Sequence, residues 1–162
     1  MQSRRLTAAE RDLATSVFGS AIALDRVRLV AGPWRGMAVT LGSHVLFPRD
    51  VIAGIRDFTG QPLALRVWFI HELTHVWQFQ RRPLWTLASW LATLLGGGYG
   101  PRRRGYRLPE NLVWKRLNLE QQAEVIAGTY RLAQTGEADD AAGDRLCACL
   151  HTSGLHTTPS RN

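Results

Sequence analysis

Residues 70–80 read IHELTHVWQFQ and lie in a run, Leu63 to Arg82, that is apolar on nearly every face. The length of this run and the proline at position 83 predict a central, buried helix. A strand over residues 65–70 is the alternative, and the length of the run favours the helix. Charged and polar side chains are costly to bury unless something pairs with them. The two histidines and the glutamate therefore indicate either a packing coincidence or a bound cation.

His71 and His75 are four residues apart, so a helix places both imidazoles on one face, where they can bind a single ion. Glu72 lies next to them, where its carboxylate can polarise a metal-bound water. This is the H-E-x-x-H arrangement of metallohydrolases, whose histidines bind zinc and whose glutamate is the general base. The motif lies in mid-helix among uncharged residues, which favours a metal site over a coincidence or a metal-free descendant.

A catalytic zinc site requires a third protein ligand. His44 falls in a predicted strand, and His151 and His156 fall in or near the C-terminal tail, so the remaining histidines are poor candidates. Glu120 lies in the first turn of a predicted helix, where the helix dipole favours an anion, and is a candidate ligand. Glu124, one turn later, is a candidate acceptor for the N–H of a ligand histidine. An exposed polar edge of an amphipathic helix is the alternative for this pair.

HELTH (71–75) followed by EQQAE (120–124) resembles the gluzincin branch of zinc peptidases. The resemblance implies that His71, His75 and Glu120 bind one Zn²⁺ and that Glu72 is the base. It gives Glu124 a supporting role at a position where aspartate is usual in that branch. The implied activity is hydrolysis of peptide bonds by a zinc metallopeptidase.

A narrower likeness covers residues 6–134. It rests on LTAAERDLATSVFGSAI, MAVTLGSHVLFP, FIHELTHVWQFQ and LNLEQQAEVI. These segments resemble small bacterial Vgr-related and Rhs-associated proteins, and the metallopeptidase domain that accompanies contractile injection systems. The likeness implies a compact α+β, zincin-like fold, with a small antiparallel sheet over the active-site helix and a second, ligand-bearing helix. It also implies that residues 40–47 form an edge strand that pairs with an extended peptide substrate.

Many zincins add a tyrosine or histidine donor that stabilises the oxyanion at the rim of the cleft. Tyr130 is our candidate for this role, and Tyr99, Tyr106 and His44 are alternatives. Ordinary packing or surface exposure is the competing interpretation for each of them.

Local signals predict the remaining elements of a single domain. The sequence TAAE is a capping box that begins a helix ending at Gly19, and Asn118 with Gln121 begins a helix ending at Gly136. Two or three antiparallel strands are expected within residues 27–48. The domain is expected to span residues 1–150, with a weak helix around 145–150 and a flexible tail at 151–162.

The stretch LWTLASWLATLL (84–95) is apolar but too short to cross a bilayer, which requires about 20 residues. It is predicted to be a second core helix or a helical arm. A surface helix that covers the substrate or binds a partner or interface is the alternative, with the glycine-rich segment 96–100 as a hinge for a lid.

Composition limits the other function classes. The chain has 162 residues, 45% apolar and 20% charged, which is typical of one globular domain and excludes wholesale disorder. Its net charge of +7 rests on arginine, since Lys115 is the only lysine, and favours acidic partners. PRRRGYR (101–107) could contact nucleic acid, although a solvated loop is the simpler interpretation. No secretory signal or transmembrane segment is visible, so the protein is expected in the cytoplasm or exported without a classical signal.

Cys147 and Cys149 are too close in sequence for an unstrained disulfide, so we expect reduced thiols. A second metal site formed by CACLH with His156 is a weaker hypothesis, because residues two apart on a helix point in different directions.

Three hypotheses remain. The first is a zinc metallopeptidase that is an accessory or effector of an injection system, with a secretion-system partner and a peptide or protein substrate. The second is a protease that works at nucleic acid. The third is a catalytically inactive zinc-binding or protein-binding module, and the intact Glu72 argues against it because zinc ligation does not require that residue.

Overall fold

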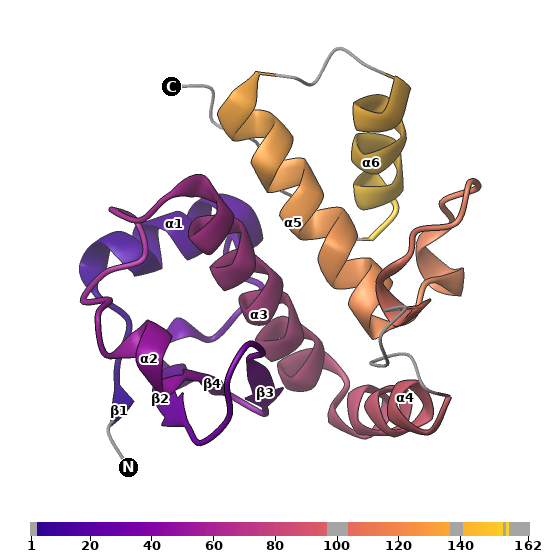
Figure 1. Ribbon diagram of the computed structural model, residues 1–162. Coiled ribbons are helices and arrows are strands. Elements are labelled where there is room, and N and C mark those ends of the chain that lie inside the picture. Colours follow the sequence, from indigo (N-terminus) through magenta and orange to yellow (C-terminus); the bar gives the residue numbers. More distant parts are fainter. Residues whose placement is uncertain (1–2, 97–103, 137–140, 154, 156–162) are drawn as a thin grey trace.

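In the computed structural model, helix α3 (Leu63–Arg81) runs through the middle of the molecule between two groups of elements (Figure 1). A small sheet with α1 and α2 lies on one side of α3, and α5 and α6 lie on the other. The structure describes residues 3–96, 104–136, 141–153 and 155, without the side chains of Arg104 and Ala141. The predicted α+β class is confirmed.

The described helices and strands follow in chain order. The other α-helices are α1 (Ala8–Phe18), α2 (Arg49–Ile52), α4 (Pro83–Leu95), α5 (Leu119–Thr135) and α6 (Ala141–His151). Short 3-10 turns are η1 (Leu24–Arg26), η2 (Arg104–Tyr106) and η3 (Trp114–Arg116). The strands are β1 (Ser3–Arg4), β2 (Arg28–Gly32), β3 (Val39–Leu41) and β4 (His44–Pro48).

Capping boxes begin α1 and α5, as the sequence predicted. The Thr7 hydroxyl accepts from the Glu10 amide at 3.1 Å, and the Glu10 carboxylate accepts from the Thr7 amide at 2.9 Å. Asn118 and Gln121 form the same reciprocal pair at 2.9 and 3.0 Å. Gly136 ends α5 with φ of 72°, a left-handed conformation that costs glycine nothing. The position at which α5 begins is therefore encoded locally.

Glu10 also connects three parts of the N-terminal half. Its fully buried carboxylate forms a bidentate ion pair with the Arg4 guanidinium of β1, with N–O distances of 2.7 and 2.8 Å. The same carboxylate accepts from the Phe58 amide at 3.0 Å. One side chain thus joins β1, the start of α1 and the segment that leads into α3.

The sheet has the strand order β1-β2-β4-β3 and is mixed, which corrects the expectation of an antiparallel sheet. β1 with β2 and β3 with β4 are antiparallel, but β2 and β4 are parallel, with Leu29 opposite Val45 and Ala31 opposite Phe47. The chain leaves β2, forms β3 on the outside and returns as β4. Consecutive residues Leu29, Val30 and Ala31 are all buried, as is typical of a parallel strand.

The predicted edge strand over residues 40–47 is also corrected. Gly42 and Ser43 form a two-residue hairpin turn that divides the segment into β3 and β4, with Leu41 opposite His44. Gly42 has φ of 61°, which such a turn favours. Only β3 lies at the edge of the sheet, because β4 is enclosed between β3 and β2.

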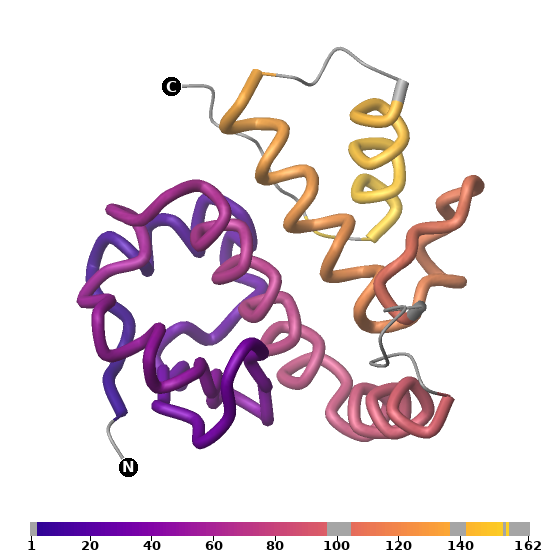
Figure 2. The backbone as a smooth tube through the Cα atoms, in the orientation of Figure 1, coloured from indigo at the N-terminus to yellow at the C-terminus, as the bar shows by residue number. Residues whose placement is uncertain are grey.

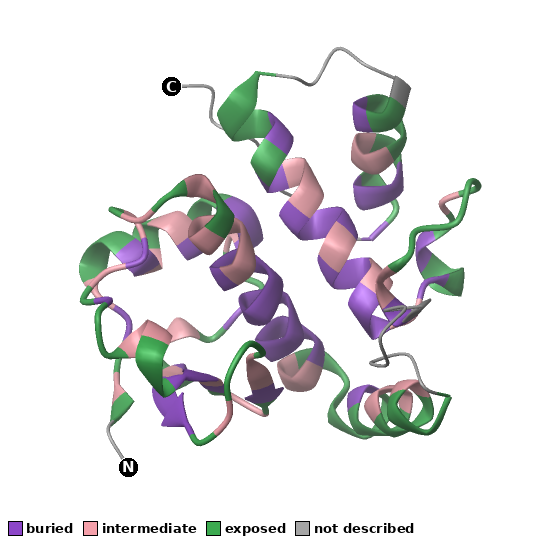
Figure 3. Ribbon diagram, viewed as in Figure 1, coloured by how far each residue is buried: buried purple, intermediate pink, exposed green. Residues whose placement is uncertain are grey.

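The core lies between α3 and its two neighbours. Every residue of α3 from Phe69 to Gln78 is buried, since the sheet covers one side of the helix and α5 covers the other (Figure 3). Phe58 stacks on Phe69, with ring centroids 4.7 Å apart, and Phe47 lies 4.9 Å from Phe58. The prediction of a central buried helix is confirmed.

Helix α4 is a surface arm rather than a second core helix. It begins at Pro83, directly after the end of α3, and lies at the periphery of the molecule (Figure 2). Thr86 is its one buried residue. Residues 97–100 of the predicted hinge lie outside the described part of the chain. No helix in that described part is long and apolar enough to cross a membrane.

The C-terminal helix is longer than predicted, since α6 spans Ala141–His151 and packs on α5. Cys149 and Leu150 are buried there, and Ser153 and Leu155 beyond the helix are buried as well. Both cysteines are free thiols, as expected.

We predict that Glu10→Ala lowers the free energy of unfolding by about 3 kcal/mol, because it leaves Arg4 and the Phe58 amide without their buried partner. Asp12→Ala, at an exposed position of the same helix, is the matched control and should change stability by less than about 0.5 kcal/mol. Urea denaturation followed by circular dichroism measures both. Equal effects of the two variants would contradict the connecting role of Glu10.

Candidate metal centre

Two adjacent helices bring three of the predicted site residues together. His71 and His75 lie one turn apart on the face of α3 that packs against α5, and Glu120 lies in the first turn of α5. All three are buried, and they form a group of side chains able to hold a metal ion. The two histidines are neighbours because of their spacing, but Glu120 reaches them only because α5 packs on α3.

The donor atoms converge on one point. His71 Nε2 and His75 Nε2 are 3.2 Å apart, and each is 3.2 Å from the same Glu120 oxygen, Oε2. Ligands placed tetrahedrally around zinc, about 2.0–2.1 Å from the ion, lie about 3.3 Å from one another. The spacing of these three atoms therefore fits three corners of a zinc tetrahedron.

The remaining nitrogen of each imidazole faces an acceptor. His71 Nδ1 is 3.2 Å from Glu124 Oε1, and His75 Nδ1 is 2.9 Å from Gln78 Oε1. The Gln78 amide is oriented by its own NH₂ group, which donates to the Leu119 carbonyl and to Gln122 Oε1, both at 3.0 Å. A proton on each Nδ1 satisfies these acceptors and leaves the Nε2 lone pairs directed at the centre.

The electrostatics of the cluster also call for a cation. Burial alone lowers the pKa of His71, but hydrogen bonds to Glu120 and Glu124 outweigh it and raise that pKa to about 10. The pKa of His75 is likewise raised, because Glu120 outweighs the effect of burial. The pKa of Glu120 is held low by the two histidines despite its burial. Protons supply the positive charge in the metal-free cluster, and a divalent ion can replace them.

Glu72 lies beside the cluster and is held at both carboxylate oxygens. Thr40 of β3 donates its hydroxyl to Oε2 at 2.8 Å, and Trp68, one turn earlier on α3, donates its indole N–H to Oε1 at 3.2 Å. Each carboxylate oxygen can still accept a second hydrogen bond. The sheet edge and the helix together fix the orientation of this carboxylate.

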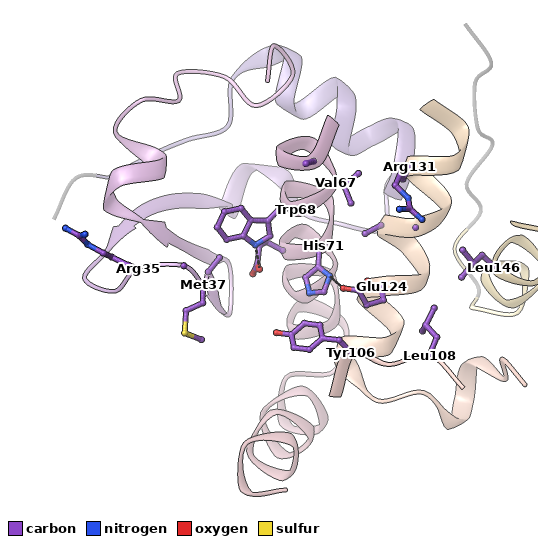
Figure 4. A pocket seen from close by; sticks show the side chains of 16 residues that line it. Arg35, Met37, Val67, Trp68, His71, Tyr106, Leu108, Glu124, Arg131 and Leu146 are labelled. Carbon is purple, nitrogen blue, oxygen red and sulfur yellow. Dashed lines mark hydrogen bonds and ion pairs between the residues drawn. The ribbon is translucent and has the colours of Figure 1, made fainter. Parts of the chain in front are cut away.

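A cleft of about 870 Å³ opens over His71, Glu72 and Glu124. Arg35 and Arg131 lie toward opposite ends of it, while Tyr106 and Leu108 line the side near α5 (Figure 4). Tyr106 stacks on His71 with ring centroids 5.9 Å apart. A substrate in this cleft would pass over the His71 and Glu72 side chains.

A second, smaller cavity of about 110 Å³ also borders Glu72. Trp90 and Leu94 of α4 line it together with Thr40, and it also reaches His75 and Glu120. Tyr106 borders both cavities. The inner face of α4 therefore forms part of the surroundings of the His71, His75 and Glu120 cluster.

The candidate oxyanion donors differ in whether they border the cleft. Tyr130 does not line the cleft; its buried hydroxyl is 3.5 Å from Arg66 Nη1, and burial raises its pKa. His44 is exposed at the start of β4, and Tyr99 lies outside the described residues. Of the candidates that the structure describes, Tyr106 is the one that borders the cleft.

Several residues of the site were not found from the sequence. Gln78 lies three residues after His75 and Trp68 lies four before Glu72, so helical spacing could have indicated both. Thr40 belongs to a distant segment, and no local signal connects it to the motif. Tyr106 was one of the alternative donors named from the sequence, but no signal there placed it beside His71.

The weaker predicted sites gain no support. The metal-capable cluster found among the described side chains contains neither cysteine. His156 and residues 101–103 of the basic segment fall outside the described ranges, so the second metal site and the nucleic-acid contact stay predictions.

Comparison with known proteins relates the chain to a secretion-system component. It is 30% identical over 159 residues to the type VI secretion system spike protein VgrG2b of Pseudomonas aeruginosa. That match covers 91% of this chain but only 15% of the spike protein. No protein-family model matches the sequence.

The fold is similar to the solved effector domain of Pseudomonas aeruginosa VgrG2b. The TM-score is 0.64 and the sequence identity 28%, and the match covers 94% of this chain and 83% of that domain. Sequence and structure together indicate homology to this effector domain, which confirms the predicted Vgr-related association.

We predict that the protein, purified without a metal-affinity tag, contains one zinc per chain, measured by inductively coupled plasma mass spectrometry. Glu120→Ala should lose the metal, because it removes one of the three ligands. Glu124→Ala should weaken zinc affinity by about 10–100-fold, because it removes only the acceptor of the His71 N–H.

Glu110→Ala, at an exposed site before α5, is the control and should bind zinc like the wild type. Wild-type protein that stays free of zinc after reconstitution would contradict the assignment of the cluster as a metal site.

Proposed function

We propose that the chain is a zinc-dependent metallopeptidase and acts as an effector or accessory domain of a contractile injection system. The observation that carries the activity is the convergence of the His71, His75 and Glu120 donor atoms, with the oriented Glu72 carboxylate beside them. Homology to an effector domain supports the association with an injection system. The matched region is only 15% of the full-length spike protein. An injection-system partner for this chain is therefore part of the proposal.

His71, His75 and Glu120 would hold the zinc ion. When bound, zinc would supply a Lewis acid that makes water more acidic and polarises a peptide carbonyl. Glu124 and Gln78 would keep the two imidazoles in the ligating tautomer by accepting their Nδ1 protons.

Glu72 would accept a proton from the attacking water and pass it to the nitrogen of the leaving amine. Hydrogen bonds from Thr40 and Trp68 fix its carboxylate, so little reorganisation is needed when the proton moves. Tyr106 borders the cleft next to His71, where its hydroxyl could contact the substrate.

The position of β3 supports an extended peptide as the substrate. Among the described strands, β3 lies at an edge of the sheet with no strand on its outer side, and its Thr40 donates to the proposed base. A peptide that pairs with this edge would lie along the cleft and present a backbone carbonyl to the cluster.

The inactive binding module is the principal rival. It would preserve the metal ligands but would have no need for Glu72 to be buried and held by two donors from different elements. Turnover by the wild type distinguishes the two hypotheses.

We predict that Glu72→Gln abolishes cleavage of unfolded casein, with a loss of at least about 100-fold in kcat, while zinc content is unchanged. The amide keeps the size of the side chain but cannot accept the proton. Glu110→Gln serves as the matched control and should retain wild-type activity. A Glu72→Gln enzyme that remains fully active would exclude Glu72 as the base.

A second variant tests the orientation of the base. Thr40→Val should lower kcat by about tenfold or more with little change in KM or zinc content, because the carboxylate loses one of its two donors. Thr40→Ser keeps the hydroxyl and should restore most of the rate. If Thr40→Ser were as slow as Thr40→Val, restoring the hydroxyl would not restore the rate, and the hydrogen bond to Glu72 would be excluded as the cause of the loss.

A further inference from the structure

Most of helix α4 is exposed (Figure 3), and its exposed residues include several leucines that no other described part of the fold covers fully. Four leucines recur at helical spacing along it, so they form one stripe about 17 Å long. Trp85 borders the stripe and is 40% exposed. The stripe and the exposed fractions of its members are Leu84, 83%; Leu87, 41%; Leu91, 43%; and Leu95, 86%.

The inner side of α4 adjoins the stripe and fixes the helix to the protein. Thr86 is buried there, and Trp90 and the 48% exposed Leu94 line the 110 Å³ cavity beside the His71, His75 and Glu120 cluster. α4 is therefore held by its inner side while the leucine stripe points into solvent. Contiguous exposed apolar surface of this kind marks an interaction site.

The charge around α4 favours an anionic partner. Arg81 and Arg82 immediately precede the helix, and both are exposed. The Arg81 guanidinium lies over the Trp77 ring, 5.6 Å from its centroid, which holds the charge close to the start of α4. The sequence contains no acidic residue between Glu72 and Glu110, and the whole chain carries a net charge of +7.

Leucine side chains with a bordering tryptophan and basic residues at one end are the pattern of a helix that lies in a membrane interface. Protein–protein hot spots, in contrast, are poor in leucine. At 13 residues α4 is about 20 Å long, which is too short to cross a hydrocarbon core of about 30 Å. A helix of this kind binds a bilayer by lying parallel to its surface.

We propose that the outer face of α4 binds the surface of an anionic lipid bilayer. The leucine stripe and Trp85 enter the boundary between headgroups and acyl chains, and Arg81 and Arg82 contact anionic headgroups. Since the inner face of α4 lines the cavity beside Glu72, binding brings the metal cluster close to the membrane. The proposal concerns a lipid surface and does not depend on peptide hydrolysis.

Co-sedimentation of the 162-residue chain with large unilamellar vesicles tests it. The vesicles contain phosphatidylcholine mixed with phosphatidylglycerol, and pure phosphatidylcholine vesicles are the comparison. The chain should bind the mixed vesicles more tightly, and added salt should weaken that binding because it screens the arginines. Leu91→Gln should lower the partition coefficient about tenfold, and the Leu87→Gln, Leu91→Gln double variant should lower it further.

Val113→Gln is the control, because Val113 is similarly exposed, at 45%, but lies outside α4. It should bind like the wild type. Circular dichroism checks that every variant is folded, which is expected because the substituted leucines are exposed.

A second measurement does not require a substitution in the stripe. Phosphatidylcholine with brominated acyl chains, mixed with phosphatidylglycerol, should quench the fluorescence of wild-type protein more than that of Trp85→Phe. Equal quenching of the two proteins would overturn insertion of Trp85.

Three sedimentation results would also overturn the proposal. They are absence of binding to the mixed vesicles, binding that the leucine variants retain in full, and self-association through α4 that leaves the vesicles unbound.

Discussion

The packing of α3 against α5 depends on positive charge in the buried space between them, because the Glu120 carboxylate lies there. Glu120 is almost fully enclosed there, and its carboxylate oxygen faces two imidazole nitrogens at 3.2 Å. A carboxylate in so poorly solvated a place is strongly destabilising without a cation. The α5 capping box puts Glu120 in the first helical turn, where the helix dipole adds to the stabilisation of its charge. The packing of the two longest helices and the proposed chemistry thus share one electrostatic requirement.

Features encoded by neighbouring residues could be predicted from the sequence. The capping pairs at Thr7 and Asn118, the stop at Pro83 and the left-handed Gly136 all act within one or two helical turns, so the helix bounds followed from them. The spacing of His71 and His75 likewise places two donor atoms together whenever α3 forms. Glu120 was a candidate ligand because it lies in the first turn of a predicted helix, and the resemblance of EQQAE to a known arrangement supported it; its contact with the histidines depends on tertiary packing.

Features that depend on the path of the chain could not be predicted in this way. Parallel pairing of β2 with β4 requires β3 to lie on the outside, and no local pattern specifies that order. Gly42 and Ser43 are residues typical of a tight turn, but the prediction placed them inside a single strand over residues 40–47. The contact of Thr40 with Glu72 follows from this topology. The exposure of α4 was equally hidden, because its composition is that of a core helix and only tertiary structure shows which elements cover it.

The distribution of the three ligands along the chain has a consequence for the order of folding. His71 and His75 become neighbours as soon as one segment turns helical, whereas Glu120 is separated from His75 by 45 positions and arrives only when α5 docks. Closing that loop costs chain entropy before the contact returns any energy. A nascent or unfolded chain therefore presents an incomplete, weakly binding pair of histidines. The complete set of three proposed ligands therefore forms late, with the finished tertiary structure, and the proposed metal binding and hydrolysis would begin only then.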